Sequence, residues 1–263
     1  AQIMSREPRR LILVGDEAQL PPVQQGQPFH DLIKAFPDKV VNLTKCFRNK
    51  EAVFKAATEI RNGRMPRMFD DSGEEQWEVR ETGGPEQTQT AILGMIRNGL
   101  IDFDTDIILC PRNGSKNNPG ACTVNALNAA IVQIVNPRES NERLKVGDRV
   151  INTKNYPDID IWNGTTGTIA AIDYDNSVYI KLDIPIVDSK HAAVNGGETI
   201  YTNSVKVPKK DAKTLELAYA LTVHKAQGSQ YKNVIFCCLT RDITPMLTRS
   251  LIYTAITRTQ TSC

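Results

Sequence analysis

The chain has 263 residues, of which 40% are hydrophobic and 24% are charged, and its formal net charge is +2. These values are typical of a globular protein with one large or two smaller domains. No apolar run approaches the roughly 20 residues of a membrane span, and the first ten residues lack the apolar core of a signal peptide. We therefore expect a cytoplasmic protein with no membrane partner. The weakly basic balance does not by itself indicate nucleic-acid binding, which must rest on local patches.

The six cysteines show neither a CxxC pattern nor a spacing with histidine that is typical of a metal site. We therefore predict no metal site. Cys237 and Cys238 lie in the apolar run VIFCCL, where buried, reduced thiols are the expectation.

The first apolar segment, residues 11–14, predicts a short buried strand. It delivers the loop GDEAQLPPV, residues 15–23, whose polar side chains include Asp16 and Gln19. Two prolines stiffen the exit of this loop. By its chemistry the loop is suited to contact a phosphate or simply to turn a corner.

A helix is predicted from Pro28 to Phe36, because Pro37 cannot continue it. Residues 40–43 then predict a second strand, followed by Arg48. By itself, an arginine in this place is typical of solvated surface.

Apolar residues at helical spacing predict three further helices, at residues 51–62, 87–98 and 123–135. Residues 64–84 predict a loop with one short strand, and residues 106–111 a buried strand. The residues expected to face the core from the first two helices are Val53, Ala56, Ala57, Ile60, Ile92, Leu93 and Ile96. Thr123 is expected to cap the third helix. Asn125 and Asn128 on its polar face are candidates to bind nucleic acid, although a polar helix face is more often solvated.

Residues 145–208 alternate like strands and contain no convincing helix, which predicts a small antiparallel barrel. Tyr156, Trp162 and Tyr201 are candidates to stack on bases. Burial in the barrel core is the competing interpretation, and we favour it for Trp162. A basic run suited to phosphates, or simply to solvent, follows at Lys206, Lys209, Lys210 and Lys213.

Residues 215–221 predict a buried strand that ends in a polar turn, within LTVHKAQGSQY. In an open α/β sheet, ligands bind outside the carboxyl ends of the strands. Thr222, His224 and Lys225 supply donors or charge there, and Gly228 allows a close backbone approach. The alternative is a polar strand-to-helix loop with a C-capping glycine.

The last part of the chain returns to an α/β pattern. The apolar run 233–239 is typical of a central parallel strand. A final helix is predicted to open at Thr244 or Pro245 and to run through Ala255, which places Arg258 near its end.

Four strings in this order resemble motifs III to VI of superfamily 1 helicases, in the 1B branch of the RecD, TraA/TraI and Dda proteins. They are GDEAQLPPV, the L-x-x-x-x-R that ends at Arg48, LTVHKAQGSQY and YTAITR. GDRVINTKNYPDIDIWNGTTGTI resembles the SH3-like insertion of RecD and Dda helicases. The resemblance implies an α/β fold: a RecA-like, P-loop NTPase-type parallel sheet domain forming the second helicase lobe, with the inserted barrel and the end of the first lobe. The implied boundaries are 1–37 for the first lobe, 38–144 with 209–263 for the second, and 145–208 for the barrel.

The resemblance also implies a function, that of an ATP-dependent DNA helicase moving 5′ to 3′ along single-stranded DNA. Gln19, Arg48 and Arg258 would act on the terminal phosphate of ATP bound with Mg²⁺. Further nucleotide contacts would come from Gly15, Asp16, Gly228 and Gln230, and DNA contacts from Thr222, His224, Lys225, Asn125 and Tyr156. Recombination, conjugation and replication complexes are the implied partners.

The sequence departs from the complete family pattern. It contains no G-x-x-x-x-G-K-[ST] loop and no apolar strand ending in the Asp-Glu pair that would hold magnesium; Asp16 and Glu17 belong to motif III. We therefore expect a fragment that is inactive alone, with ATP and Mg²⁺ held mainly by a missing amino-terminal segment. We also expect the strand that follows motif VI in the family to be missing, and relatives commonly carry glutamate where this chain has Gln230. The alternative function is a non-catalytic module that binds single-stranded DNA or a protein partner.

Overall fold

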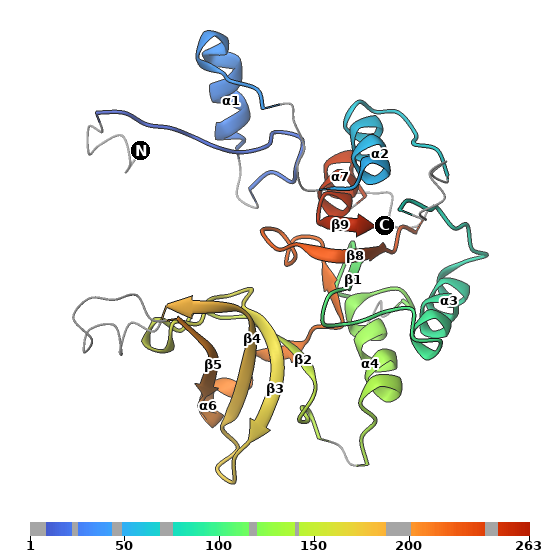
Figure 1. The fold of residues 1–263 in the computed structure, drawn as a ribbon, viewed down its shortest axis with the longest axis vertical. Helices are drawn as coiled ribbons and strands as arrows, with labels where there is room; N and C mark the ends of the chain where they lie inside the picture. Colours follow the sequence, from blue (N-terminus) through green and yellow to red (C-terminus); the bar gives the residue numbers. More distant parts are fainter. Residues whose placement is uncertain are drawn as a thin grey trace.

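The computed structural model describes residues 9–22, 26–43, 49–68, 76–115, 120–139, 142–187, 201–239 and 247–263. Arg48 and the predicted start of the last helix at Thr244 or Pro245 lie outside these residues. Two β-sheets organise the described chain, one parallel and one antiparallel (Figure 1).

The parallel sheet contains β1 (Ile107–Cys110), β7 (Ala220–Thr222), β8 (Tyr231–Phe236) and β9 (Thr259–Ser262). Its strand order is β7-β1-β8-β9, so β1 and β8 are central. All three strand pairs are parallel. This sheet confirms the predicted α/β fold class and fits a RecA-like domain.

Strand β9 corrects one expectation. We predicted that the strand after YTAITR would be missing, but Thr259 pairs with Tyr231 of β8 and residues up to Ser262 continue the strand. The sequence TQTS lacks the apolar run by which we recognised the central strands. It forms an edge strand, where only one side of the backbone needs a neighbouring strand.

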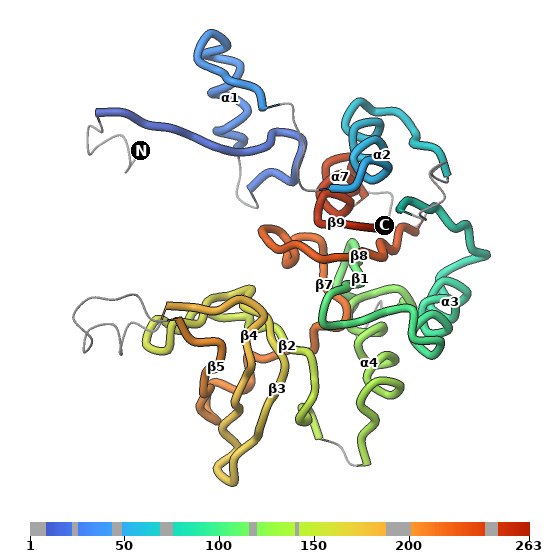
Figure 2. The backbone as a smooth tube through the Cα atoms, viewed as in Figure 1, coloured from blue at the N-terminus to red at the C-terminus, as the bar shows by residue number. Residues whose placement is uncertain are grey.

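Helices cover both faces of the parallel sheet (Figure 2). On one face, α3 (Pro85–Arg97) and α4 (Val124–Val135) pack against Ile108 and Cys110 of β1. On the other, α7 (Arg249–Ile256) packs against Ile107 and Leu109, and α2 (Glu51–Arg61) packs on α7. Successive side chains of a strand point to opposite faces, so a four-residue strand serves two cores.

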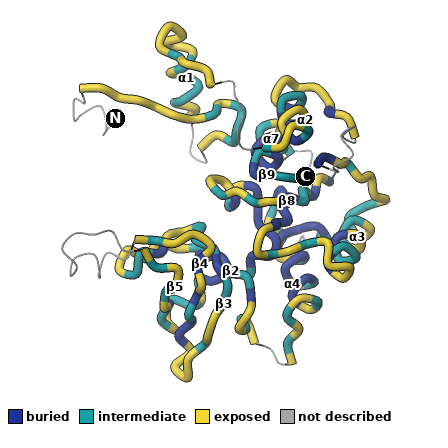
Figure 3. Tube along the Cα trace, in the orientation of Figure 1, coloured by how far each residue is buried: buried dark blue, intermediate teal, exposed yellow. Residues whose placement is uncertain are grey.

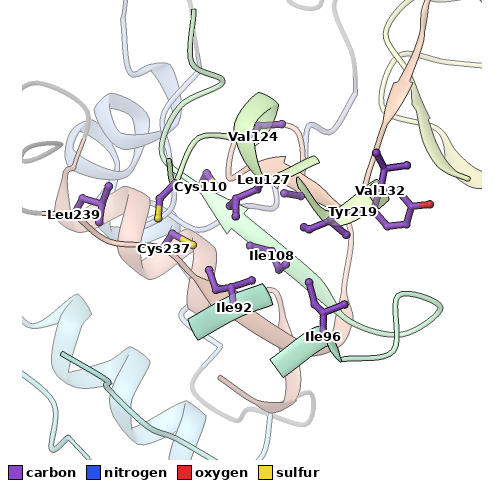
Figure 4. Packing of buried hydrophobic residues seen from close by; sticks show 13 residues of the cluster. Ile92, Ile96, Ile108, Cys110, Val124, Leu127, Val132, Tyr219, Cys237 and Leu239 are labelled. Carbon is purple, nitrogen blue, oxygen red and sulfur yellow. The ribbon is translucent and has the colours of Figure 1, made fainter. Parts of the chain in front are cut away.

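The larger core is almost sealed from solvent (Figure 3). Ile108, Leu127 and Tyr219 are each 0% exposed, and Figure 4 shows them gathered between β1 and the helices of that face. Burying side chains of this size contributes roughly 1.5–3 kcal/mol each.

The predicted helices are confirmed in the described regions, except that Leu247 and Thr248, which were expected inside the last helix, precede it. In α2, the inward residues Val53, Ala56, Ala57 and Ile60 are the buried ones. The Thr123 hydroxyl accepts a hydrogen bond from Ala126 N and so caps α4. Helix α7 begins at Arg249, and the Thr248 side chain caps it in the same way.

Two strand predictions near the amino terminus are wrong. Residues 11–14 and 40–43 form no strand; Val14 and Leu43 are each 88% exposed. Between them, α1 (Pro28–Ala35) begins at the predicted proline and is followed by the 3-10 helix η2 (Pro37–Lys39), but neither buries a residue. A strand needs a neighbour for its backbone groups, and no described strand lies beside either segment.

The antiparallel sheet contains β2 (Arg149–Asn152), β3 (Thr166–Ile172), β4 (Val178–Val187), β5 (Tyr201–Val207) and β6 (Leu215–Leu217). Its order is β5-β4-β3-β2-β6, and two short helices, η3 (Pro157–Ile159) and α6 (Lys209–Ala212), lie in its connections. The predicted antiparallel strands are confirmed, and they bury a separate apolar core that includes Ile161, Ile169 and Ile180.

The predicted single strand at 215–221 is wrong. It divides at Ala218 and Tyr219, so that β6 joins the antiparallel sheet and β7 the parallel one. The Asn128 side chain, predicted to be solvated, is buried at this division. Its amide donates to Leu217 O and Ala220 O and accepts from Ala220 N. Apolar periodicity did not reveal the division because apolar residues occur on both sides of it, at Leu215 and Leu217 and at Ala220 and Leu221.

Two further burial predictions are corrected. Trp162, expected in the barrel core, is 51% exposed, because it lies in the turn between β2 and β3 rather than in a strand. Cys238 is exposed, whereas Cys237 is buried beside Cys110 and Cys122. The hydrogen bond with Cys110, together with burial, raises the pKa of the Cys237 thiol well above its usual value. The described cysteines form no disulfide.

No helix among the described residues is long and apolar enough to cross a membrane. No group of three or more histidine, cysteine or acidic side chains is arranged there to hold a metal ion.

Candidate functional site

The loop after residue 14 lies against helix α7. The Asp16 carboxylate accepts from Ala18 N at 3.1 Å and from the Tyr253 hydroxyl at 2.9 Å. Leu20 N donates to the Thr254 hydroxyl at 2.9 Å. Two consecutive α7 residues therefore hold the two ends of the Asp16–Leu20 turn, more than 230 positions away in the chain.

Gln19 and Arg258 meet at the centre of this contact. Arg258 Nη2 donates to Gln19 Oε1 at 3.2 Å, while Gln19 Nε2 donates to Asp16 Oδ2 at 3.2 Å. The amide of Gln19 is thus bonded at both its ends. The structure thus brings together two of the three residues that were predicted to share one site.

Arg258 is 4% exposed, although its guanidinium carries a permanent charge. Besides Gln19, it donates to Thr254 O, Ser229 O and the Thr257 hydroxyl. All four of these acceptors are neutral oxygens.

The site lies at the edge of the sheet where strands begin. Arg258 immediately precedes β9 and accepts at its carbonyl from Tyr231 N, the first residue of β8. Burial raises the pKa of the Tyr231 phenol. Gln230 also precedes β8 and accepts from the Gln260 side chain at 3.2 Å.

Thr222, His224 and Lys225 lie near the opposite edge. Thr222 ends β7 beside Cys110, the last residue of β1, because the two strands are parallel and in register. Its hydroxyl accepts from Lys225 N, and Lys225 Nζ lies 2.7 Å from the Glu216 carboxylate. Thr222 therefore lies at the carboxyl edge, as expected. Ser229 and Gln230, later in the same polar turn, lie instead with Arg258 at the opposite edge.

The remaining candidates are spread over the molecule. Gly228 has a φ of +95°, a left-handed conformation that favours glycine. The ring of Phe29 lies over Gly15, which leaves 3.1 Å for an added Cβ. Asn125 donates to Gly114 O in the loop before α4, and the Tyr156 hydroxyl donates to Thr214 within the antiparallel sheet. These two lie apart from the Gln19–Arg258 contact.

Sequence reasoning missed Tyr253 and Thr254 as site residues. Thr254 precedes Arg258 by four positions, so a helical reading of YTAITR places these two on one face. That spacing was a usable signal.

The two segments that meet at this site, around Gln19 and around Arg258, each match a family of known proteins. Residues 217–263 match the UvrD-like helicase C-terminal domain, and residues 1–82 match an AAA domain. The chain is 31% identical to the ATP-dependent RecD2 DNA helicase of Deinococcus radiodurans, over 95% of this chain and 31% of that protein. It is 28% identical to the RecBCD enzyme subunit RecD of Mycolicibacterium smegmatis, over 97% of this chain and 45% of that subunit.

Over nearly its whole length the chain resembles the RecD-type helicases.

This RecD-like chain is also 24% identical to a probable conjugal transfer protein TraA of Sinorhizobium fredii, over 95% of its length and 21% of that protein. Among solved structures, a Pif1 helicase from Bacteroides in complex with ADP-AlF3 and ssDNA matches with a TM-score of 0.49 and 20% identity. That match covers 94% of this chain and 59% of the other. The RecD-like chain thus spans about a third to a half of the length of the two RecD-type relatives.

Proposed function

We propose that this RecD-like chain forms the carboxyl-terminal part of an ATP-dependent DNA helicase that couples ATP hydrolysis to movement along single-stranded DNA. The observation that carries the proposal is the Gln19–Arg258 contact, which joins two family motifs 239 positions apart. By resemblance to the RecD branch, the direction of movement is 5′ to 3′.

The chemistry of the contact suits a terminal phosphate. Phosphoryl transfer is accelerated mainly by positioning and by stabilising negative charge. Arg258 supplies a fixed positive charge, and Gln19 supplies an amide whose orientation is already set by Asp16. We propose that both act on the terminal phosphate, together with Arg48, which lies outside the described residues. Gly15, Gly228 and Gln230 complete the proposed nucleotide contacts.

The donor set fits ATP with Mg²⁺ only in part. Cationic and amide donors are present, but the sequence lacks the P-loop and the Asp-Glu strand that would hold the other phosphates and the metal. Bound ATP supplies the phosphoanhydride bond that is cleaved. We propose that residues outside this sequence hold most of the nucleotide, so that the chain alone does not hydrolyse ATP.

The proposed domain division is 1–37 for the end of the first RecA-like lobe, 38–144 with 209–263 for the second, and 145–208 for an SH3-like insertion. Exposed apolar residues support the first assignment. Ile12 and Phe36 are 73% and 54% exposed, and helix α1 has an apolar side but no buried residue. We propose that these surfaces pack on the rest of the first lobe. Because β6 pairs with β2, the inserted sheet also uses residues 215–217.

We propose that single-stranded DNA lies across the carboxyl edge of the parallel sheet and the antiparallel sheet. Thr222, His224 and Lys225 are near that edge, and Asn125 lies close after β1, in the first turn of α4. Tyr156 is on the antiparallel side, where Lys154 Nζ lies 5.6 Å from its ring centre. In this arrangement the proposed DNA contacts and the Gln19–Arg258 site lie at opposite ends of the parallel strands.

DNA-stimulated ATPase activity of a helicase that contains this segment tests the proposal. We expect Arg258→Ala to lower kcat by about 10³-fold, the range seen when an arginine is removed from a phosphoryl-transfer site. Arg61→Ala, an exposed arginine at the end of α2, is the control and should leave kcat unchanged. Full activity of Arg258→Ala would refute the proposed role.

The alternative is a non-catalytic module that binds single-stranded DNA or a protein partner. The absence of a P-loop pattern from the sequence favours it. The two functions differ in a simple way: under the alternative, a protein containing this segment binds DNA but shows no DNA-stimulated ATPase activity, and Arg258→Ala changes neither property.

A further inference from the structure

The side chain of Tyr253 lies at the start of a chain of hydrogen bonds that ends at Arg258. Its hydroxyl donates to Asp16 Oδ2 at 2.9 Å, and the same carboxylate oxygen accepts from Gln19 Nε2 at 3.2 Å. Gln19 Oε1 then accepts from Arg258 Nη2 at 3.2 Å. Tyr253 lies in α7 and Arg258 follows two residues after its end, so the bonds form a closed loop through this short stretch of chain.

This loop determines which way round the Gln19 amide lies. An amide has a donor end and an acceptor end, and exchanging them would place Nε2 against the guanidinium and Oε1 against the carboxylate. Both contacts would then pair like with like. The Asp16 carboxylate is therefore what holds the amide in its orientation, provided that the carboxylate itself is held.

Tyr253 is well placed to hold that carboxylate. The tyrosine is 8% exposed and packs with Ile256, Val53 and Trp77, so its ring has little freedom. A hydrogen bond from a fixed donor to a charged acceptor is stronger than one between neutral groups. Asp16 Oδ1 is fixed separately by Ala18 N, which leaves the Oδ2 atom to link Tyr253 with Gln19.

We propose that Tyr253 is a positioning residue, which sets the orientation of the Gln19 amide through Asp16 and thereby prepares the contact of Gln19 with Arg258. The consequence for the reaction rests on the proposed ATPase function. Tyr253 does not touch the nucleotide in this scheme. Its hydroxyl keeps the loop and α7 in one arrangement when the terminal phosphate is present.

The positioning role is tested on this chain itself by NMR of the isotope-labelled protein. The side-chain amide resonances of Gln19 are assigned from their loss in Gln19→Ala. In Tyr253→Phe, which keeps the ring and removes only the hydroxyl, we expect these resonances to move towards those of solvated glutamines and their hydrogen exchange to accelerate by about ten-fold, because the carboxylate is no longer anchored.

Tyr219→Phe is the matched control. Tyr219 is also buried and also donates its hydroxyl to a carboxylate, Asp148 Oδ1 at 3.3 Å, but far from Gln19 in the fold. The Gln19 resonances should not change in this variant. Unchanged Gln19 resonances in Tyr253→Phe, or an equal change in Tyr219→Phe, would overturn the positioning role.

The consequence for the reaction is tested in a helicase that contains this segment. Tyr253→Phe should lower kcat about ten-fold while KM for ATP changes less than about two-fold, because positioning acts on the transition state more than on binding. Equal kcat in Tyr253→Phe and the parent would overturn this consequence. If the parent itself hydrolyses no ATP, the proposed function fails, and the NMR result still decides whether Tyr253 positions Gln19.

Discussion

The Arg138 guanidinium donates to the Asp148 carboxylate at 2.8 Å, and the two side chains are 8% and 0% exposed. Lys145 N, Asn136 Nδ2 and the Tyr219 hydroxyl also donate to this carboxylate. The cluster joins the chain that leaves α4 to the linker between β6 and β7, the two places where the chain crosses between the sheets. Asp148 therefore ties both crossings together.

Removing the arginine should be costly. Arg138→Ala leaves a buried carboxylate without its cation, which costs about 3–5 kcal/mol. We expect the lower end, because the Nη1 atom of Arg138 has no hydrogen-bond partner in the described structure. Urea unfolding measures the change. The matched control is Arg64→Ala, since the Arg64–Glu59 pair is exposed and screened by water, so its removal should change the stability far less. Similar losses from both variants would contradict this account of the cluster.

Two glycines should respond in opposite directions to an added methyl group. At Gly167 in β3, a Cβ would lie 2.4 Å from Lys181 O and 2.7 Å from the Ile180 side chain, so Gly167→Ala must push apart two paired strands. At Gly94 in α3, nothing lies within 4 Å, and alanine is the better helix former. We expect Gly167→Ala to lower the free energy of unfolding by about 1–3 kcal/mol and Gly94→Ala to raise it by up to about 1 kcal/mol.

Thermal or urea unfolding of the two glycine variants provides the measurement. A stable Gly167→Ala protein would mean that β3 and β4 are not packed as closely as the structure places them.

Alkaline pH should weaken the fold through Tyr219. Burial, with the nearby Asp148 carboxylate, raises the pKa of its phenol from 10.0 to about 12. The folded state therefore holds this proton more tightly, so the stabilisation is fully present below pH 10 and is lost as the pH rises towards 12. The free energy of unfolding should fall more steeply over this range in the parent chain than in Tyr219→Phe.

Tyr174→Phe is the control for this pH effect, because Tyr174 is fully exposed. Its unfolding curve should follow that of the parent chain at every pH. Identical pH profiles for the parent and Tyr219→Phe would contradict the assigned cause.

Binding to single-stranded DNA should depend on salt through the exposed lysines at α6. Lys209 and Lys210 are exposed at the exit from the antiparallel sheet, whereas Lys206 is paired with Asp173 at 2.9 Å. If the exposed lysines neutralise phosphates, each replacement by alanine should lower the slope of log K against log salt by about 0.7. Lys206→Ala should change it less. Fluorescence anisotropy across a salt series measures the slopes. Equal slopes in all variants would exclude Lys209 and Lys210 as phosphate contacts.

Local patterns were sufficient for the helices and for the central strands. The inward residues of α2 and the Thr123 cap of α4 follow from spacing and side-chain chemistry, which act over one or two helical turns. The apolar segments 11–14 and 40–43, which have no described strand beside them, could not be judged in this way. Their apolar character is real, but a strand forms only when a second segment satisfies its backbone.

The sequence by itself determined the order of the motifs, and with it the resemblance to RecD-like helicases and the candidate residues Gln19 and Arg258. Only the tertiary structure decided that Tyr253 and Thr254 hold the Gln19 loop, that residues 215–221 serve two sheets, and that Arg258 and Thr222 lie at opposite sheet edges. The physical reason is range. Helix periodicity and capping are written in neighbouring residues, whereas these contacts join segments far apart in the chain, and folding must bring those segments together before such contacts exist.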